Sequence, residues 1–122
     1  MKILIADSDA AYSGVLKEKL EKEKLDVDVV CDGKDVCARV KASKPDLIVM
    51  DPAFTKKDGF EVLSDIKVDA ALKSIPVVVV SGMSGDQEIK RALQAGVLNY
   101  YVKDQHPIVE IVEKLKEHIL LA

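Results

Sequence analysis

The chain has 122 residues and a mass of 13.4 kDa, which suits a single domain with one hydrophobic core. Apolar residues make up 48% of it and charged residues 32%, so the composition excludes a disordered or low-complexity protein. With 18 basic and 21 acidic residues the net charge is -3, and no basic face stands out that would bind nucleic acid or an anionic membrane.

Export and membrane insertion are also unexpected. The apolar runs, of which residues 75–80 are an example, are too short to cross a bilayer, and the N-terminal segment lacks the apolar stretch and cleavage site of a secretory signal. Cys31 and Cys37 match neither a disulfide framework, nor a CxxC redox pair, nor a zinc spacing. We therefore expect a cytoplasmic protein in which both cysteines are reduced and half-buried.

Short apolar runs alternate with amphipathic stretches along the first half of the chain. Continuous apolar runs are typical of strands buried on both faces of a parallel sheet, and a period of three to four residues is typical of helices. In chain order these features predict a strand over residues 3–6, a helix with Tyr12, Val15, Leu16 and Leu20 on its apolar face, a strand over residues 27–31, a short helix around Val36, Cys37 and Val40, and a strand over residues 47–50.

The same alternation continues in the second half, with clearer signals at the helix ends. Asp58 is expected to cap a helix, and Ser84 to Gln87 has the form of a capping box. Gly96 is a natural stop for the second of these helices, and Pro107 fits the first turn of the last one. The predicted elements are a helix with Phe60, Leu63 and Ile66, a strand over residues 75–80, a helix ending at Gly96, a strand over residues 99–102, and a helix with Ile108, Ile111, Leu115 and Ile119.

Five strand–helix units in succession predict an α/β fold with a parallel sheet covered by helices on both faces. The right-handed crossover rule leaves a doubly wound sheet as the compact solution, and a closed eight-stranded barrel is excluded by length.

Polar residues follow four of the five predicted strands. In open α/β sheets, ligands bind beyond the carboxyl ends of the strands, so these side chains should gather at one rim: Asp7, Asp9, Asp51, Ser81 and Lys103. Carboxylates, a hydroxyl and an amine suit a divalent cation beside a phosphoryl group, and a carboxylate can itself become the nucleophile that forms an acyl phosphate. Taken singly, each acid is better explained as a helix cap or a solvated side chain; it is their common position at one rim that favours a functional site.

Five segments in this order and spacing resemble the receiver domain of two-component response regulators: residues 2–7, 45–51, 58–61, 76–82 and 100–103. The resemblance covers essentially the whole chain, so residues 1–122 are expected to form one receiver domain. It implies a flavodoxin-like, five-stranded parallel sheet in the order 2-1-3-4-5. It further implies that Asp51 accepts a phosphoryl group from a sensor histidine kinase or a histidine phosphotransfer protein.

The resemblance also implies roles for other residues at the strand ends. Mg²⁺ is the implied cofactor, with Asp7, Asp51 and the Ala53 carbonyl as its ligands. The implied phosphoryl-binding residues are Ala53, Ser81, Gly82 and Lys103. Ser81 and Tyr100 match the two switch residues, of which Tyr100 should turn inward when Ser81 moves toward the phosphoryl group.

Three positions depart from the family pattern. Ser8 stands where the family usually has its second acidic residue, so either Ser8 or Asp9 is left to complete the Mg²⁺ site and weak binding is expected. Asp9 is also expected to cap the helix that follows it. Asp104 follows Lys103 where a proline is usual, so the peptide bond there should be trans, and Thr55 replaces another usual proline.

The expected function is therefore phosphorelay signalling by a monomeric or weakly dimeric domain, which catalyses only its own Mg²⁺-dependent phosphorylation and dephosphorylation. The resemblance implies that a downstream protein binds the surface formed by the fourth helix, the fifth strand and the fifth helix. The alternative is a pseudo-receiver, an interaction module that no longer uses phosphate. Ser8 and Asp104 favour it, and four residues together count against it: Asp51, Ser81, Tyr100 and Lys103. Flavin and dinucleotide binding are disfavoured, because the loop after the first strand is acidic and GxGxxG is absent.

Overall fold

A computed structural model describes residues 1–121. Its five strands are β1 (Lys2–Ala6), β2 (Asp26–Val30), β3 (Leu47–Met50), β4 (Val77–Ser81) and β5 (Asn99–Val102). All neighbouring pairs are parallel, and the spatial order is β2-β1-β3-β4-β5. The predicted doubly wound α/β fold is therefore confirmed, although β1 begins one residue earlier than predicted and β2 and β4 are displaced from their predicted ranges by one or two residues.

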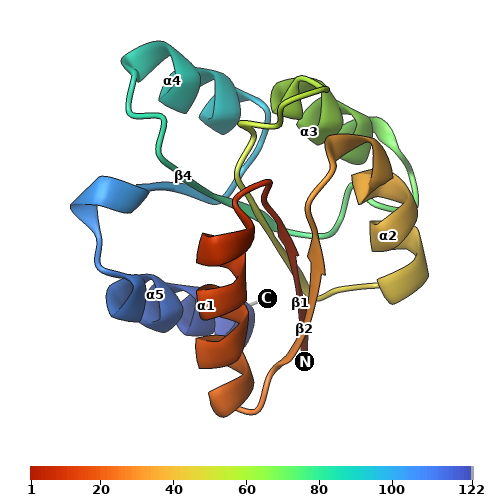
Figure 1. The fold of residues 1–122 in the computed structure, drawn as a ribbon. Coiled ribbons are helices and arrows are strands. Elements are labelled where there is room, and N and C mark those ends of the chain that lie inside the picture. Colours follow the sequence, from red (N-terminus) through yellow and green to blue (C-terminus); the bar gives the residue numbers. More distant parts are fainter. Residues whose placement is uncertain (122) are drawn as a thin grey trace.

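Five helices cover the two faces of this sheet (Figure 1): α1 (Ala10–Lys22), α2 (Val36–Ser43), α3 (Gly59–Val68), α4 (Asp86–Gln94) and α5 (Ile108–Leu121). In Figure 1, α1 and α5 lie together on one side of the sheet, and α2, α3 and α4 lie on the other. Two single 3₁₀ turns, η1 (Gly33–Asp35) and η2 (Lys103–Gln105), were not predicted from the sequence.

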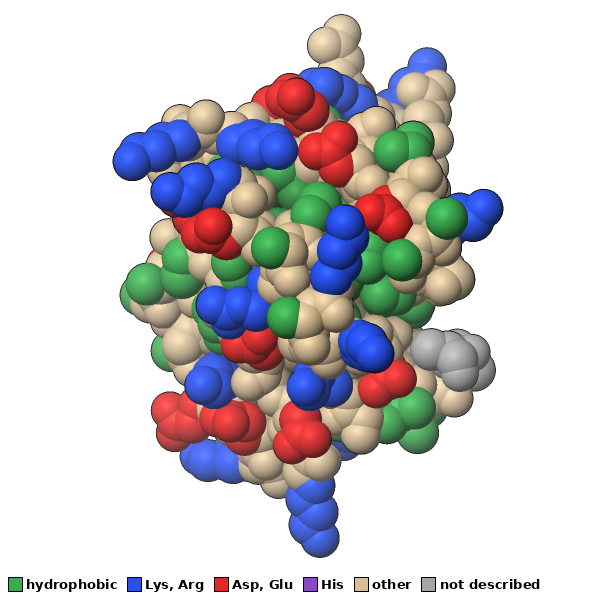
Figure 2. Space-filling model, turned by 90° about the vertical axis from the view of Figure 1, so that its right-hand side faces the viewer, with side chains coloured by type: hydrophobic (Ala, Val, Ile, Leu, Met, Phe, Trp, Pro, Cys, Tyr) green, Lys and Arg blue, Asp and Glu red, His purple; other side chains and the backbone are tan. Residues whose placement is uncertain are grey.

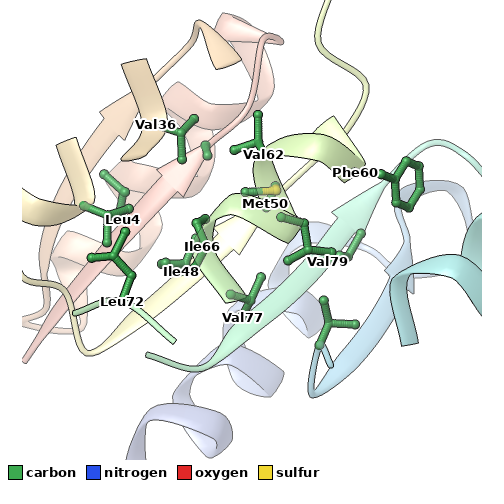
Figure 3. Close-up of a cluster of buried hydrophobic side chains, with 14 of the residues drawn as sticks. Leu4, Val36, Ile48, Met50, Phe60, Val62, Ile66, Leu72, Val77 and Val79 are labelled. Atoms are coloured by element: carbon green, nitrogen blue, oxygen red, sulfur yellow. The ribbon is translucent and has the colours of Figure 1, made fainter. Parts of the chain in front are cut away.

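The core consists of two apolar layers because successive strand residues point to opposite faces of the sheet. Leu4, Ile48 and Val77 contribute to the layer beneath α2, α3 and α4, where Figure 3 shows them against Ile66 and Leu72. Their strand neighbours face the opposite way, and they pack against α1 and α5: Ile3, Ile5, Leu47, Val49, Val78 and Val80. A sheet buried on both faces leaves its strand ends as the place for polar chemistry.

Two of the predicted helix caps are confirmed and one is wrong. Asp9 accepts a hydrogen bond from the Tyr12 amide at 3.0 Å, and Asp58 accepts one from the Phe60 amide at 3.0 Å. The cap residue of α4 is Gly85 rather than Ser84, and no side chain caps it. The predicted apolar face of α1 also needs a correction, because the Val15 side chain is exposed while Leu16 and Leu20 are buried.

The surface carries both signs of charge. Figure 2 shows basic and acidic side chains interspersed over the face that α2 and α3 cover. None of the helices within residues 1–121 is both long and apolar enough to span a membrane. Both cysteines are free, but Cys31 is exposed and only Cys37 is half-buried, so the expected burial holds for one of the two.

Candidate functional site

The candidate site lies where β1 and β3 end, at the point where the strand order reverses. The hydrogen-bond ladder continues one residue beyond each strand, since the Asp51 amide donates to the Ala6 carbonyl at 2.9 Å and the Asp7 amide donates to the Val30 carbonyl at 3.0 Å. These bonds hold two adjacent carboxylates at the rim of the sheet. Only 3% of Asp7 and 8% of Asp51 is exposed. Crevices at such switch points are the usual ligand sites of open α/β sheets.

Lys103 joins the two carboxylates. Its Nζ donates to Asp7 Oδ2 at 2.9 Å and to Asp51 Oδ2 at 3.0 Å, with 13% of the lysine side chain exposed. Burial by itself would lower the pKa of Lys103, but hydrogen bonds and charge from Asp7 and Asp51 outweigh it, so the pKa is raised. The ammonium group therefore stays charged, and it neutralises part of the negative charge at the site.

Asp51 is held from its other side by a hydroxyl and an amide. Ser81 is fully buried, and its Oγ donates to Asp51 Oδ1 at 2.8 Å. The Ala53 amide donates to the same oxygen at 3.0 Å. The three donors predicted to contact a phosphoryl group (Lys103, Ser81 and the Ala53 amide) thus already converge on the carboxylate predicted to carry it.

Ser81 is linked through Met83 to Tyr100. The Met83 amide donates to Ser81 Oγ at 3.1 Å, and the Tyr100 hydroxyl donates to the Met83 carbonyl at 2.7 Å. Tyr100 is half-buried and packs against the core, so its side chain lies inward in this structure. The sequence resemblance implied an inward position only after phosphorylation. The backbone of Met83 therefore connects the two predicted switch residues.

Asp7, the second carboxylate of the site, is also desolvated. Burial raises the pKa of the Asp7 carboxyl, and the neighbouring Asp51 charge adds to this effect. The Asp9 amide, which donates to Asp7 Oδ1 at 2.8 Å, and Lys103 partly offset it. Asp7 therefore holds its proton more firmly than an exposed aspartate, and a second cation at the site would favour its ionised form.

Ser8 and Asp9 take different positions at the rim. The Ser8 hydroxyl is exposed and donates to the Ala53 carbonyl oxygen at 3.1 Å, and this is the oxygen predicted to bind the metal. The Asp9 carboxylate instead caps α1. Within residues 1–121 no group of three or more His, Cys, Asp and Glu side chains is arranged to hold a metal ion. Two carboxylates and one carbonyl oxygen nevertheless fit a hard divalent cation such as Mg²⁺, which often keeps several waters.

The remaining predicted positions lie around this centre. Gly82 is exposed beside Ser81, and a Cβ at Gly82 would meet no atom within 4 Å. Asp104 lies in η2, and the peptide bonds of residues 1–121 are all trans, as predicted for the bond that follows Lys103. Thr55 lies in the loop between β3 and α3, which has no regular structure.

Tyr12 is a member of the site that sequence reasoning assigned to the core. Its ring lies against Lys103, with Nζ 4.1 Å from the ring centroid. The helical spacing of Tyr12 with Leu16 and Leu20 was correct, but it did not reveal that the first turn of α1 brings this residue to the rim.

The chain matches the sequence model of the response regulator receiver domain over residues 3–116. Transcriptional regulatory protein PdtaR of Mycobacterium tuberculosis is 31% identical over 123 residues, and the alignment covers 95% of this chain but 58% of PdtaR. This chain thus spans less than two thirds of that relative.

Two solved structures are similar over almost the whole fold. The phosphorylated cyanobacterial phytochrome response regulator RcpA has a TM-score of 0.87 and 33% identity, with 98% of this chain and 93% of that chain covered. The Mn²⁺-bound form of response regulator Rcp1 has a TM-score of 0.84 and 26% identity, with 95% and 91% covered. Together with the sheet order and the acidic strand ends, these matches show that the chain belongs to the receiver domain family of two-component response regulators, which serves phosphorelay signalling.

Proposed function

We propose that this receiver domain accepts a phosphoryl group on Asp51 from the phosphohistidine of a sensor histidine kinase or a histidine phosphotransfer protein. One observation carries the proposal: a buried carboxylate at the switch point receives hydrogen bonds from Lys103 Nζ, Ser81 Oγ and the Ala53 amide. Such donors are the groups needed to offset the charge of a phosphoryl group, which carries close to two negative charges at neutral pH.

The proposed transfer balances without a further reactant. A carboxylate oxygen of Asp51 attacks phosphorus, and an O–P bond forms as the P–N bond of the phosphohistidine breaks. The electron pair of that bond stays on the imidazole, which takes up a proton from solvent. Water later attacks the acyl phosphate and releases inorganic phosphate, which restores the Asp51 carboxylate. In this proposal the domain catalyses only these two reactions of its own side chain and acts on no separate substrate.

Receiver domains generally bind Mg²⁺, and Rcp1 provides a structure with bound Mn²⁺. We propose that Asp51 and the Ala53 carbonyl hold the ion directly and that Asp7 holds it through water. The ion supplies positive charge where the phosphoryl oxygens approach the carboxylates. Weak binding is proposed because Ser8 brings a hydroxyl in place of a carboxylate, and because that hydroxyl is bonded to Ala53.

The signal is proposed to leave through α4, β5 and α5. Ser81, Met83 and Tyr100 form a hydrogen-bonded connection from Asp51 toward this surface. Leu93 of α4 is 48% exposed, and Val109 of α5 is 61% exposed, so apolar side chains are available there for a downstream protein. We propose that this exchange takes place in the cytoplasm and that a partner reads the phosphorylated and unphosphorylated forms with different affinity.

Incubation with acetyl phosphate and Mg²⁺, followed by intact-protein mass measurement, tests the proposed acceptor. The wild-type protein is expected to gain the mass of one phosphoryl group, and Asp51→Asn is expected to gain none. A pseudo-receiver would gain none in either form. This second candidate is favoured by Ser8 and by its bond to the Ala53 carbonyl, which occupies one of the proposed metal ligands.

Ser8→Asp is expected to tighten Mg²⁺ binding in a calorimetric titration, because a carboxylate is a stronger ligand for a hard cation than a hydroxyl. Asp9→Asn is the matched control: asparagine is an equally good helix cap, so it can keep the bond from the Tyr12 amide while it removes a charge. We expect Asp9→Asn to leave Mg²⁺ affinity nearly unchanged. Loss of binding in that variant would assign the missing ligand to Asp9 instead.

A further inference from the structure

The ammonium group of Lys103 has a third contact besides the two carboxylates. Lysine presents three N–H donors, of which two are directed to Asp7 and Asp51. The ammonium also lies over the face of the Tyr12 ring, with Nζ 4.1 Å from the ring centroid. This distance is within the range of a cation–π interaction, which strengthens as the cation is removed from water.

Hydrogen bonds at the start of α1 fix the backbone position of Tyr12. The Tyr12 amide is bonded to the Asp9 carboxylate, and the Asp9 amide is bonded to Asp7, so Tyr12 is tied through the cap to the acidic pair. Lys103 comes from the opposite end of the chain, at the end of β5. The long, flexible side chain of Lys103 thus contacts the aromatic ring of a residue whose backbone is fixed by the helix cap.

The Tyr12 hydroxyl is buried and has no hydrogen-bond partner within the described part of the chain. A buried polar group without a partner costs stability, so packing alone favours phenylalanine at this position. The ring packs against the core and also contacts the Lys103 ammonium. The contributions of the ring and of the hydroxyl can therefore be distinguished, because phenylalanine keeps the ring and removes the hydroxyl.

We propose that Tyr12 is a positioning residue for the phosphorylation of Asp51: its ring face holds the Lys103 ammonium in place and shields it from water as the phosphoryl group arrives. The inference rests on the proposed function of Asp51 and Lys103. Its physical basis is that a fixed, desolvated cation stabilises developing charge better than a mobile, hydrated one. The residue acts through Lys103 and does not contact the reacting atoms.

Two substitutions test the proposal, with the initial rate of phosphorylation by acetyl phosphate as the first readout. Tyr12→Leu is expected to slow the reaction about fivefold or more, because it removes the aromatic face. Tyr12→Phe keeps that face and is expected to restore the rate to within about twofold of wild type. Val15→Ala, on the exposed side of the same helix, is the control for changes to α1 itself, and is expected to react at the wild-type rate.

The second readout is the position of the Lys103 ε-methylene proton signals, which an adjacent aromatic ring displaces. We expect the displacement in the wild type and in Tyr12→Phe, and its loss in Tyr12→Leu. Equal rates in Tyr12→Leu and wild type would overturn the proposal, as would a Tyr12→Phe variant as slow as Tyr12→Leu, which would assign the effect to the hydroxyl. If the wild type accepts no phosphoryl group, the proposed function fails by itself; unchanged methylene signals in Tyr12→Leu would then overturn the contact independently.

Discussion

Replacing Lys103 with methionine is expected to lower the free energy of unfolding by about 3 kcal/mol at pH 7, because two buried carboxylates lose their shared cation. Methionine keeps much of the apolar side chain, so the effect reports on the ammonium group. Removal of one partner from a buried ion pair is far more costly than the net value of the pair, since the remaining charges have neither water nor a counter-ion. Urea unfolding of both proteins measures the difference.

The pH dependence of this stability difference tests whether the lost ammonium charge is its cause. The carboxylates raise the pKa of Lys103 in the folded protein, so its stabilising contribution is complete at neutral pH and is lost as the pH rises through that folded pKa. On the acid side the pKa of Asp7 is raised by burial, so Asp7 takes up a proton, and stops being a charged partner of Lys103, at a higher pH than an exposed aspartate would. The difference in stability between the variant and the wild type should therefore shrink as the pH falls into the acid range. A difference that stays constant from pH 3 to pH 7 would contradict the electrostatic explanation.

Lys57→Met is the matched control. Lys57 forms an ion pair with Asp65 at 3.4 Å, but 33% and 48% of these two side chains are exposed. Exposed pairs contribute between zero and about 1 kcal/mol, because water and salt screen them. We therefore expect a small, nearly pH-independent change in this variant, against which the loss at Lys103 can be judged.

Gly59→Ala is expected to lower the free energy of unfolding by about 3 kcal/mol or more, at least as much as the replacement of Lys103. A Cβ at Gly59 would lie 2.1 Å from the Pro52 carbonyl oxygen and 2.3 Å from its Cα. Both are backbone atoms and cannot turn aside as a flexible side chain would. Because Pro52 directly follows Asp51, any relief of this clash should also displace the acceptor and slow its phosphorylation.

Gly14→Ala provides the opposite expectation within the same protein. Gly14 lies in α1, and a Cβ there would meet nothing within 4 Å. Alanine favours a helix over glycine by about 1 kcal/mol, so this variant should be more stable than the wild type. The denaturant midpoints of the two alanine variants are therefore expected to move in opposite directions. A small loss of stability in Gly59→Ala would contradict this expectation and would show that the loop after Asp51 can adapt.

The fold was predictable because β1, β3 and β4 are built on continuous apolar runs and most of the helices have apolar residues at a three-to-four-residue period. The parallel arrangement follows from these patterns alone, and the strand order followed from the family resemblance. The exceptions are local. Val15 satisfied the spacing of the α1 face but points to solvent, and the cap of α4 moved from Ser84 to Gly85 because no side-chain hydrogen bond forms there.

The candidate site was predictable as a set of residues but not as a set of contacts. Asp7, Asp51 and Lys103 were predicted to share a site because they are polar residues at strand ends, and parallel strands bring their carboxyl ends to one rim. A backbone bond such as that from the Met83 amide to Ser81 has no sequence signal, because any residue supplies the same amide. Tyr12 was missed for a related reason: its helical period is that of a core residue, and its ring contacts the aliphatic core and the lysine cation at once.

Phosphorylation of Asp51 should change the backbone amide signal of Met83 and the ring signals of Tyr100. The new oxygens compete for the Ser81 hydroxyl, which now bonds Asp51 and accepts from the Met83 amide, while Tyr100 is bonded to the carbonyl of that same residue. A pair of ¹H–¹⁵N and aromatic spectra, recorded before and after stoichiometric phosphorylation, measures this directly. We predict shifts at Met83 and Tyr100 that extend into α4 and β5. A protein that carries phosphate on Asp51 while these signals stay in place would contradict a phosphorylation-driven switch.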